Sequence, residues 1–138
     1  MSINTFAELK TAIANFLARD DLTDRIPEFI ELAEGRINRE LETREQEKRA
    51  TATLSSGNEY VSLPADLRQI RSVKLNQTPI VTLTYLSPDQ LDQEYSSDGS
   101  GTPASYSIVG QEMKIRPKPD STMTAEIIYI GNVDALSD

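Results

Sequence analysis

The chain has 138 residues, enough for one domain with a modest hydrophobic core. It has no cysteine and no histidine, which excludes disulfides, thiolate metal sites and nucleophiles activated by histidine. The net charge is −8 and neither residues 1–49 nor residues 50–138 carry a basic surplus, so tight nucleic-acid binding is not expected. No apolar run approaches the ~20 residues that span a bilayer, and no secretory signal opens the chain. We therefore expect assembly in the cytoplasm and no membrane partner.

Residues 1–49 are predicted to form an antiparallel helical hairpin. Thr5 followed by Glu8 has the spacing of a capping box, and apolar residues then recur on one helical face as far as about Arg19. A short connection leads to a second helix that begins near Pro27. Helices joined so tightly are expected to share their apolar stripes. The sequence stays compatible with a helix up to about residue 49, although little is left to bury.

The second helix has two distinct faces. One is an apolar stripe at helical spacing, made of Ile26, Ile30, Ala33, Ile37 and Leu41. On the opposite side lie Phe29, Leu32, Arg36 and Arg39, a mixture of apolar residues and arginine that is typical of protein contacts. Two interpretations stay open for this mixed face: it packs on a neighbouring element of the same chain, or it contacts another molecule.

Residues 50–131 are expected to form a small, mainly antiparallel sheet. Residues 51–54 and 60–63 flank a four-residue turn and are interpreted as a hairpin. Residues 70–75 and 80–86 are expected to be two further strands.

The next stretch contains the signals of one short helix and a loop. Ser87, Pro88 and Gln90 are typical of a helix start, and this helix is expected to end at about Tyr95. Residues 96–103 are polar and rich in glycine, which predicts a mobile surface loop.

The last part of the sheet is expected to contain a hairpin around Gly110 and Gln111 and a final strand over residues 123–130. The final strand has apolar residues on both faces, which favours a position covered on both sides. Residues 132–138 are a polar tail with no evident anchor. The predicted fold class is α+β: a single domain over residues 1–138, with an N-terminal helical hairpin and a small mainly antiparallel β-sheet with one short helix.

The residues that could carry chemistry are few. Asp20, Asp21 and Asp24 cluster where the two helices meet and are compatible with a hard cation, but acidic residues before a helix also favour its dipole without a metal. The glycines fall in no phosphate-binding pattern, and the chain has no tryptophan that would line a sugar cleft. We expect no catalytic residue, no cofactor and no metal, and therefore no enzyme.

One ordered series of segments comprises residues 19–22 followed by 26–41, then Leu63-Pro64-Ala65-Asp66, residues 115–119 and residues 135–138. These segments resemble the head-to-tail adaptor, or connector, proteins of tailed bacteriophages. Together they extend over nearly the whole chain. Similar proteins generally continue with helical sequence after the last of these segments. Three explanations stay open for the difference: an artificially shortened chain, a truncated prophage gene or a smaller natural version.

The resemblance implies a non-enzymatic structural protein of the virion neck. Usually twelve copies of such an adaptor form a ring beneath the portal protein, extend the DNA channel and offer a platform to tail or nozzle proteins. DNA only passes through the channel and is not bound by sequence. In that family the helical part commonly provides the contacts with other subunits and the portal.

A ring requires each subunit to present two different surfaces. We hypothesise that Phe29, Leu32, Arg36 and Arg39 form one side of the subunit or portal contact, with acidic residues of a neighbour opposite the arginines. Two other hypotheses stay open. One is a small regulatory module of a phage or prophage that binds a protein through the same helix face, and the other is a carboxylate-dependent hydrolase acting on cell-wall sugar.

Overall fold

The computed structural model describes residues 2–137 of the chain. It divides into two compact units. The helical unit contains the chain up to Thr43 together with the segment from Val133, and the β-unit extends from Arg44 to Asn132. The mixed α+β class is confirmed, with three α-helices and several sheets among the described residues. The single-domain organisation stays a prediction.

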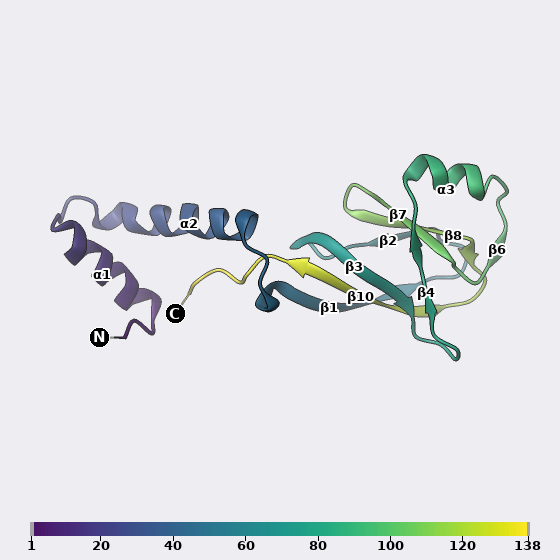
Figure 1. Cartoon of the computed structure of the whole chain (residues 1–138), viewed down its shortest axis with the longest axis horizontal. Coiled ribbons are helices and arrows are strands. Elements are labelled where there is room, and N and C mark those ends of the chain that lie inside the picture. Colours follow the sequence, from purple (N-terminus) through teal and green to yellow (C-terminus); the bar gives the residue numbers. More distant parts are fainter. Residues whose placement is uncertain (1, 138) are drawn as a thin grey trace. The chain divides into compact units, whose positions relative to one another are not determined.

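The helical unit is made of two helices, as predicted (Figure 1). Helix α1 (Phe6–Leu17) begins with the predicted capping box, in which Thr5 Oγ1 accepts from the Glu8 amide at 3.1 Å. It ends at Ala18, whose left-handed backbone (φ 51°) stops the helix. A short 3₁₀ turn, η1 (Thr23–Arg25), then leads directly into helix α2 (Ile26–Glu40).

The predicted sharing of apolar stripes is only partly present. Ile26 and Ile30 are buried, whereas Ile37 and Leu41, further along the same stripe, are 45% and 50% exposed. Helix α1 has no buried residue, and Phe16 near its end is 90% exposed. The physical reason is that α1 diverges from α2 beyond their connection, so the two helices make few contacts and α1 covers only the first part of the stripe (Figure 1).

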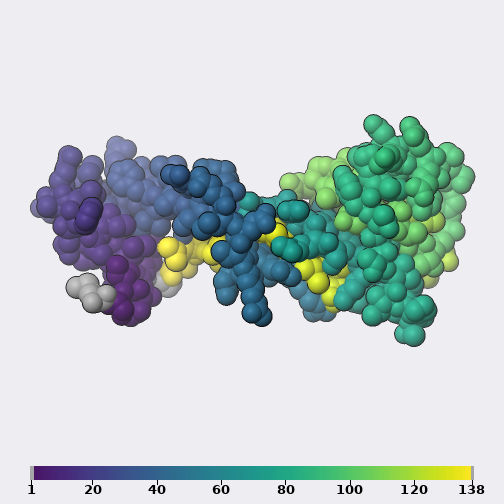
Figure 2. Space-filling model, viewed as in Figure 1, coloured from purple at the N-terminus to yellow at the C-terminus, as the bar shows by residue number. Residues whose placement is uncertain are grey.

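The structure corrects two expectations at the ends of the helical unit. Helix α2 ends at Glu40, and strand β1 already begins at Glu47, within the stretch that the sequence left compatible with a helix. The C-terminal segment is also anchored, because the Val133 amide donates to Asn38 Oδ1 at 2.9 Å and the Leu136 amide donates to Glu34 Oε1 at 2.7 Å. Figure 2 shows this segment, in yellow, lying against the blue surface of the helix.

The β-unit contains two four-stranded sheets and one pair of short strands. The first sheet has the order β1 (Glu47–Leu54), β10 (Met123–Gly131), β3 (Leu67–Leu75), β4 (Val81–Thr82), and all its pairs are antiparallel. The second sheet has the order β2 (Tyr60–Ser62), β8 (Glu112–Arg116), β7 (Ser105–Val109), β5 (Thr84–Tyr85), with β5 and β7 parallel. The short parallel pair is β6 (Ser100–Gly101) with β9 (Lys118–Pro119).

The hydrophobic core of the β-unit is formed by side chains of both four-stranded sheets. Val73, Leu75 and Ile127 come from the first sheet, and Met113 and Ile115 come from the second. All five side chains are at most 1% exposed. β10 thus lies centrally in its sheet. One side is covered by the core, whereas Ile128 on the other side is only half-buried, so the predicted coverage of both sides is only partly present.

Two predictions about the β-rich part are wrong. Strands β1 and β2 do not pair with each other: β1 pairs with β10, whereas β2 pairs with β8 in the second sheet. The turn between them, held by the Gly57 amide donating to the Pro119 carbonyl at 2.8 Å, carries the chain from one sheet to the other. The predicted loop 96–103 includes strand β6 and the buried Pro103, so it packs on the unit.

Two local predictions are confirmed. The β7–β8 hairpin turns at Gly110, which has a positive φ of 62°. Helix α3 (Pro88–Glu94) begins with a capping box between Ser87 and Gln90. The predicted strand over residues 80–86 is only partly present, because its residues divide into β4, which pairs with β3 in the first sheet, and β5, which pairs with β7 in the second sheet.

Asp66 connects distant parts of the β-unit. Its carboxylate accepts hydrogen bonds from Lys48 Nζ at 2.7 Å and from the Tyr129 hydroxyl at 3.1 Å. The hydrogen bond from Lys48 is the main reason that the pKa of Asp66 lies below its usual value. Gly131 leaves room for this cluster, because a Cβ atom there would lie 2.8 Å from Asp66 Oδ2.

Removing core volume should unfold the β-unit more easily. Ile127→Ala is expected to lower the free energy of unfolding by about 2–5 kcal/mol, because the buried side chain leaves a cavity. Ile80→Ala makes the same chemical change at a side chain that is 64% exposed and is the matched control. Urea unfolding followed by tyrosine fluorescence reports on this unit, since all five tyrosines lie between residues 44 and 132. Equal losses in the two variants would contradict the core position of Ile127.

The Asp66 cluster predicts a pH dependence. A folded-state pKa below the unfolded value stabilises the fold above that unfolded value, and this stabilisation is lost as the pH falls through the folded-state pKa. Asp66→Asn is therefore expected to lower the free energy of unfolding by about 1 kcal/mol at neutral pH, with the deficit shrinking below pH ~4. Asp120→Asn, at an exposed carboxylate, is the control. A deficit that stays constant into the acid range would show that the carboxylate charge is not responsible.

Candidate interaction surface

The mixed face of α2 is solvent-exposed along its length. Phe29 is 44% exposed and Leu32 is 71% exposed within the described chain. Helix α2 keeps these residues on one side because they follow one another at helical spacing after Pro27 at the helix start. Leu32 therefore has little packing within the described part of the chain, whereas Phe29 is more than half covered by it, and both interpretations stay open.

The two arginines of the mixed face both lie against residues of α2 itself. Arg36 Nε donates to Glu40 Oε1 at 2.9 Å, and both side chains are more than half exposed. Arg39 folds toward Gly35, where a Cβ atom would lie 3.6 Å from Arg39 Nη1. An exposed i,i+4 ion pair stabilises a helix by only about 0.3–0.5 kcal/mol, so Arg36 can exchange Glu40 for another carboxylate at little cost.

A second exposed apolar area on the helical unit was missed by the sequence reasoning. The side chains of Ile37, Val133 and Leu136, with Glu34 and Asn38, line a hollow of about 180 Å³ between α2 and the C-terminal segment. Ile37 is 45% exposed, Val133 42% and Leu136 53%. The sequence does contain a signal for this area: Val133 and Leu136 are apolar side chains three positions apart within an otherwise mostly polar segment.

The acidic cluster at the helix junction is not arranged around a cation. Arg19 Nη2 contacts Asp21 Oδ2 at 2.6 Å, and this hydrogen bond lowers the pKa of Asp21 below its usual value. Within residues 2–137, no group of three or more acidic side chains is placed so that it could hold a metal ion.

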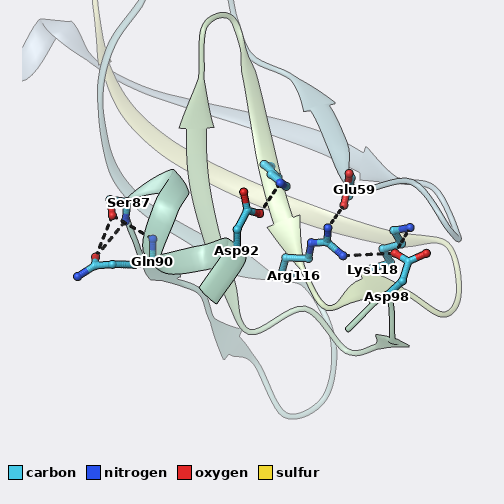
Figure 3. A network of polar contacts seen from close by, with 8 residues as sticks. Glu59, Ser87, Gln90, Asp92, Asp98, Arg116 and Lys118 are labelled. Carbon is cyan, nitrogen blue, oxygen red and sulfur yellow. Dashed lines mark hydrogen bonds and ion pairs between the residues drawn. The ribbon is translucent and has the colours of Figure 1, made fainter. Parts of the chain in front are cut away.

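The β-unit contains a network of carboxylates and basic side chains (Figure 3). Arg116 contacts Glu59 Oε2 at 2.7 Å through Nη2 and Asp98 Oδ1 at 3.5 Å through Nη1. Lys118 also binds Asp98, and Lys114 Nζ contacts Asp92 Oδ1 at 2.6 Å. The network ties α3 and the segment before β6 to strands β8 and β9.

This network is poorly suited to general acid catalysis. The hydrogen bonds from Lys114 and Lys118 lower the pKa of Asp92 and Asp98 respectively below the usual value. A general acid at neutral pH needs a carboxyl group whose pKa is raised by an apolar setting. The geometry therefore favours a structural role for these carboxylates and gives no support to the hydrolase hypothesis.

None of the helices within residues 2–137 combines the length and the apolar character needed to cross a lipid bilayer.

Comparison with known proteins identifies one family. The family model described as "SU10 adaptor protein" matches residues 4–138, which is nearly the whole chain. The search of curated proteins found no match.

Proposed function

The chain belongs to the SU10 adaptor protein family, a family of phage head-to-tail adaptors, and we propose that it forms a ring beneath the portal in the virion neck. In this role about twelve copies extend the DNA channel and carry the tail or nozzle proteins, and DNA passes through without sequence-specific contacts. Membership of an adaptor family implies a structural rather than an enzymatic role.

The observation that best supports assembly is the incomplete burial of the helical unit. Ile26 and Ile30 are its only large apolar side chains classed as buried among the described residues, while Phe16, Leu32 and Leu136 are each more than half exposed. Short helices have little stability of their own in water and gain most of it from burying an apolar face. Apolar surface left open on such a unit is typical of a protein that completes its packing against a partner.

The mixed face is our candidate for one side of the ring or portal contact. Phe29 and Leu32 supply apolar area, while Arg36 and Arg39 supply charges that pair with carboxylates of a neighbour. A ring contact is heterologous, so this face meets a different surface of the next molecule.

The adaptor role is tested by mixing the protein with the portal ring encoded in the same genome. Mass photometry or native mass spectrometry is expected to show uptake of a full ring of subunits in one cooperative step, which also gives the stoichiometry. Absence of any complex would overturn the adaptor role and favour a regulatory module that binds a different protein.

The mixed face is tested by charge reversal. Arg36→Glu with Arg39→Glu is expected to abolish uptake on the portal, because like charges across a contact cost several kcal/mol. Far-ultraviolet circular dichroism and tyrosine fluorescence should remain unchanged, since both side chains are exposed. The control, Arg19→Glu with Arg25→Glu, makes the same change in net charge at other exposed positions of the helical unit. Normal assembly of the first variant would exclude this face.

A further inference from the structure

The two units of the chain differ in charge. The residues of the helical unit include 5 basic and 11 acidic side chains, whereas those of the β-unit include 9 basic and 11 acidic ones. Within the β-unit, the basic residues concentrate on the first sheet. We call the side of this sheet that is turned away from the hydrophobic core its outer face.

Two arginines of the outer face lie at β-bulges of strand β3. The pairing of β3 with β10 shifts register twice, and each shift inserts one extra residue of β3 between two consecutive Cα pairs. These two extra residues are Arg68 and Arg71. Because Leu67, Ile70 and Val73 all pack on the core, each bulge adds an arginine on the opposite side of the sheet. Both arginines are exposed.

The centre of the outer face is already neutralised. Glu126 on β10 is only 8% exposed and contacts Arg49 Nη2 at 2.7 Å and Lys74 Nζ at 3.0 Å. Beside it, the half-buried Ile128 lines a hollow together with Arg44 and Arg49.

The face as a whole keeps a positive balance, because four basic residues stand on its strands against two acidic ones. These six residues are Arg49, Arg68, Arg71, Lys74, Glu47 and Glu126. An apolar side chain beside a neutralised carboxylate, with arginines around them, fits a protein contact, whereas a phosphate backbone would gain nothing from Ile128.

Helix α2 presents a surface of the opposite charge. Glu28, Glu31 and Gly35 follow one another at steps of three and four and share one side of the helix, between the mixed face and the C-terminal segment. Glu34 and Asp134 adjoin this side and add two more carboxylates. We call the surface formed by Glu28, Glu31 and Glu34 the acidic face. Glu28 and Glu31 are both exposed.

We propose that the outer face of the first sheet in one copy of the chain binds the acidic face of α2 in the next copy. The two surfaces differ, so the contact is heterologous and repeats from copy to copy until a ring closes. The inference rests on the proposed function, because it names both sides of a contact within that ring. The arginines of the bulges and the carboxylates of α2 supply charge complementarity, which sets the partner and the register.

The absence of cysteine allows a direct test by crosslinking in the free protein. One variant carries Gly35→Cys, where a side chain meets only Arg39 Nη1, at an ordinary 3.6 Å. The other carries Thr51→Cys, an exposed position directly opposite Glu126 in the register. One of the two cysteine variants carries a tag, so that their masses differ. The variants are mixed at high concentration and treated with a short bismaleimide crosslinker. The expected main product joins position 35 of one chain to position 51 of the other.

Charge reversal links this product to the proposed contact. Arg68→Glu with Arg71→Glu in the Thr51→Cys chain is expected to lower the yield by at least about tenfold, as is raising the salt to several times physiological strength. Adding Glu28→Arg and Glu31→Arg to the Gly35→Cys chain should restore the yield with the reversed partner. Arg19→Glu with Arg25→Glu, also placed in the Thr51→Cys chain, is the control of equal charge change. Arg25 lies 3.8 Å from Glu28, but the acidic face of that chain takes no part in the product, which should stay unchanged.

Several outcomes would overturn the inference. They are a product dominated by 35–35 or 51–51 pairs, a crosslink yield that does not change on charge reversal, and the absence of any product. Release of a bound duplex oligonucleotide by Arg68→Glu with Arg71→Glu would instead assign the outer face to nucleic acid. The measurement needs no portal, so failure of portal uptake overturns the adaptor role, whereas loss of the crosslink with normal uptake overturns only this contact.

Discussion

The pairing of β10 with β1 on one side and with β3 on the other holds the β-unit together (Figure 1). A strand in this position must satisfy its backbone on both edges and bury side chains, and β10 does so with Ala125, Ile127 and Tyr129 turned to the core. The other side of β10 carries Glu126, which is satisfied by one basic residue from each neighbouring strand. The last strand of the chain therefore fixes the positions of segments that are far apart in sequence.

The helical unit lacks a comparable constraint. Its interior holds Ile26 and Ile30, and its C-terminal segment is attached through two hydrogen bonds from backbone amides to Asn38 and Glu34. The β-unit buries a core of its own, whereas the helical unit leaves most of its apolar side chains accessible. The β-unit thus completes a core of its own, whereas the helical unit leaves apolar surface available for the partners that the proposed adaptor role requires.

What the sequence could predict was local. The capping boxes at Thr5 and Ser87 depend on residues three positions apart, and the hairpin at Gly110 depends on one turn, so short patterns suffice for both. The separation of β1 from β2 could not be predicted, because their partners β10 and β8 lie far along the chain and compete with an equally plausible local hairpin. The mixed face of α2 was visible in the helical period, but the outer face was not. Arg68 and Arg71 break the alternation of a strand, and only the register with β10 shows that both face outward.

The two bulges of β3 place the residues of the proposed contact at positions that do not contribute to the hydrophobic core. A bulge residue forms no regular pair in the ladder and contributes no side chain to the core, so its identity can change with little effect on the sheet. Evolution can therefore alter the charges at positions 68 and 71 without disturbing Leu67, Ile70 or Val73. Related phages that infect the same cell would then have a simple means of keeping their subunits from mixing, because one reversed charge pair discriminates against the wrong neighbour while the fold stays the same.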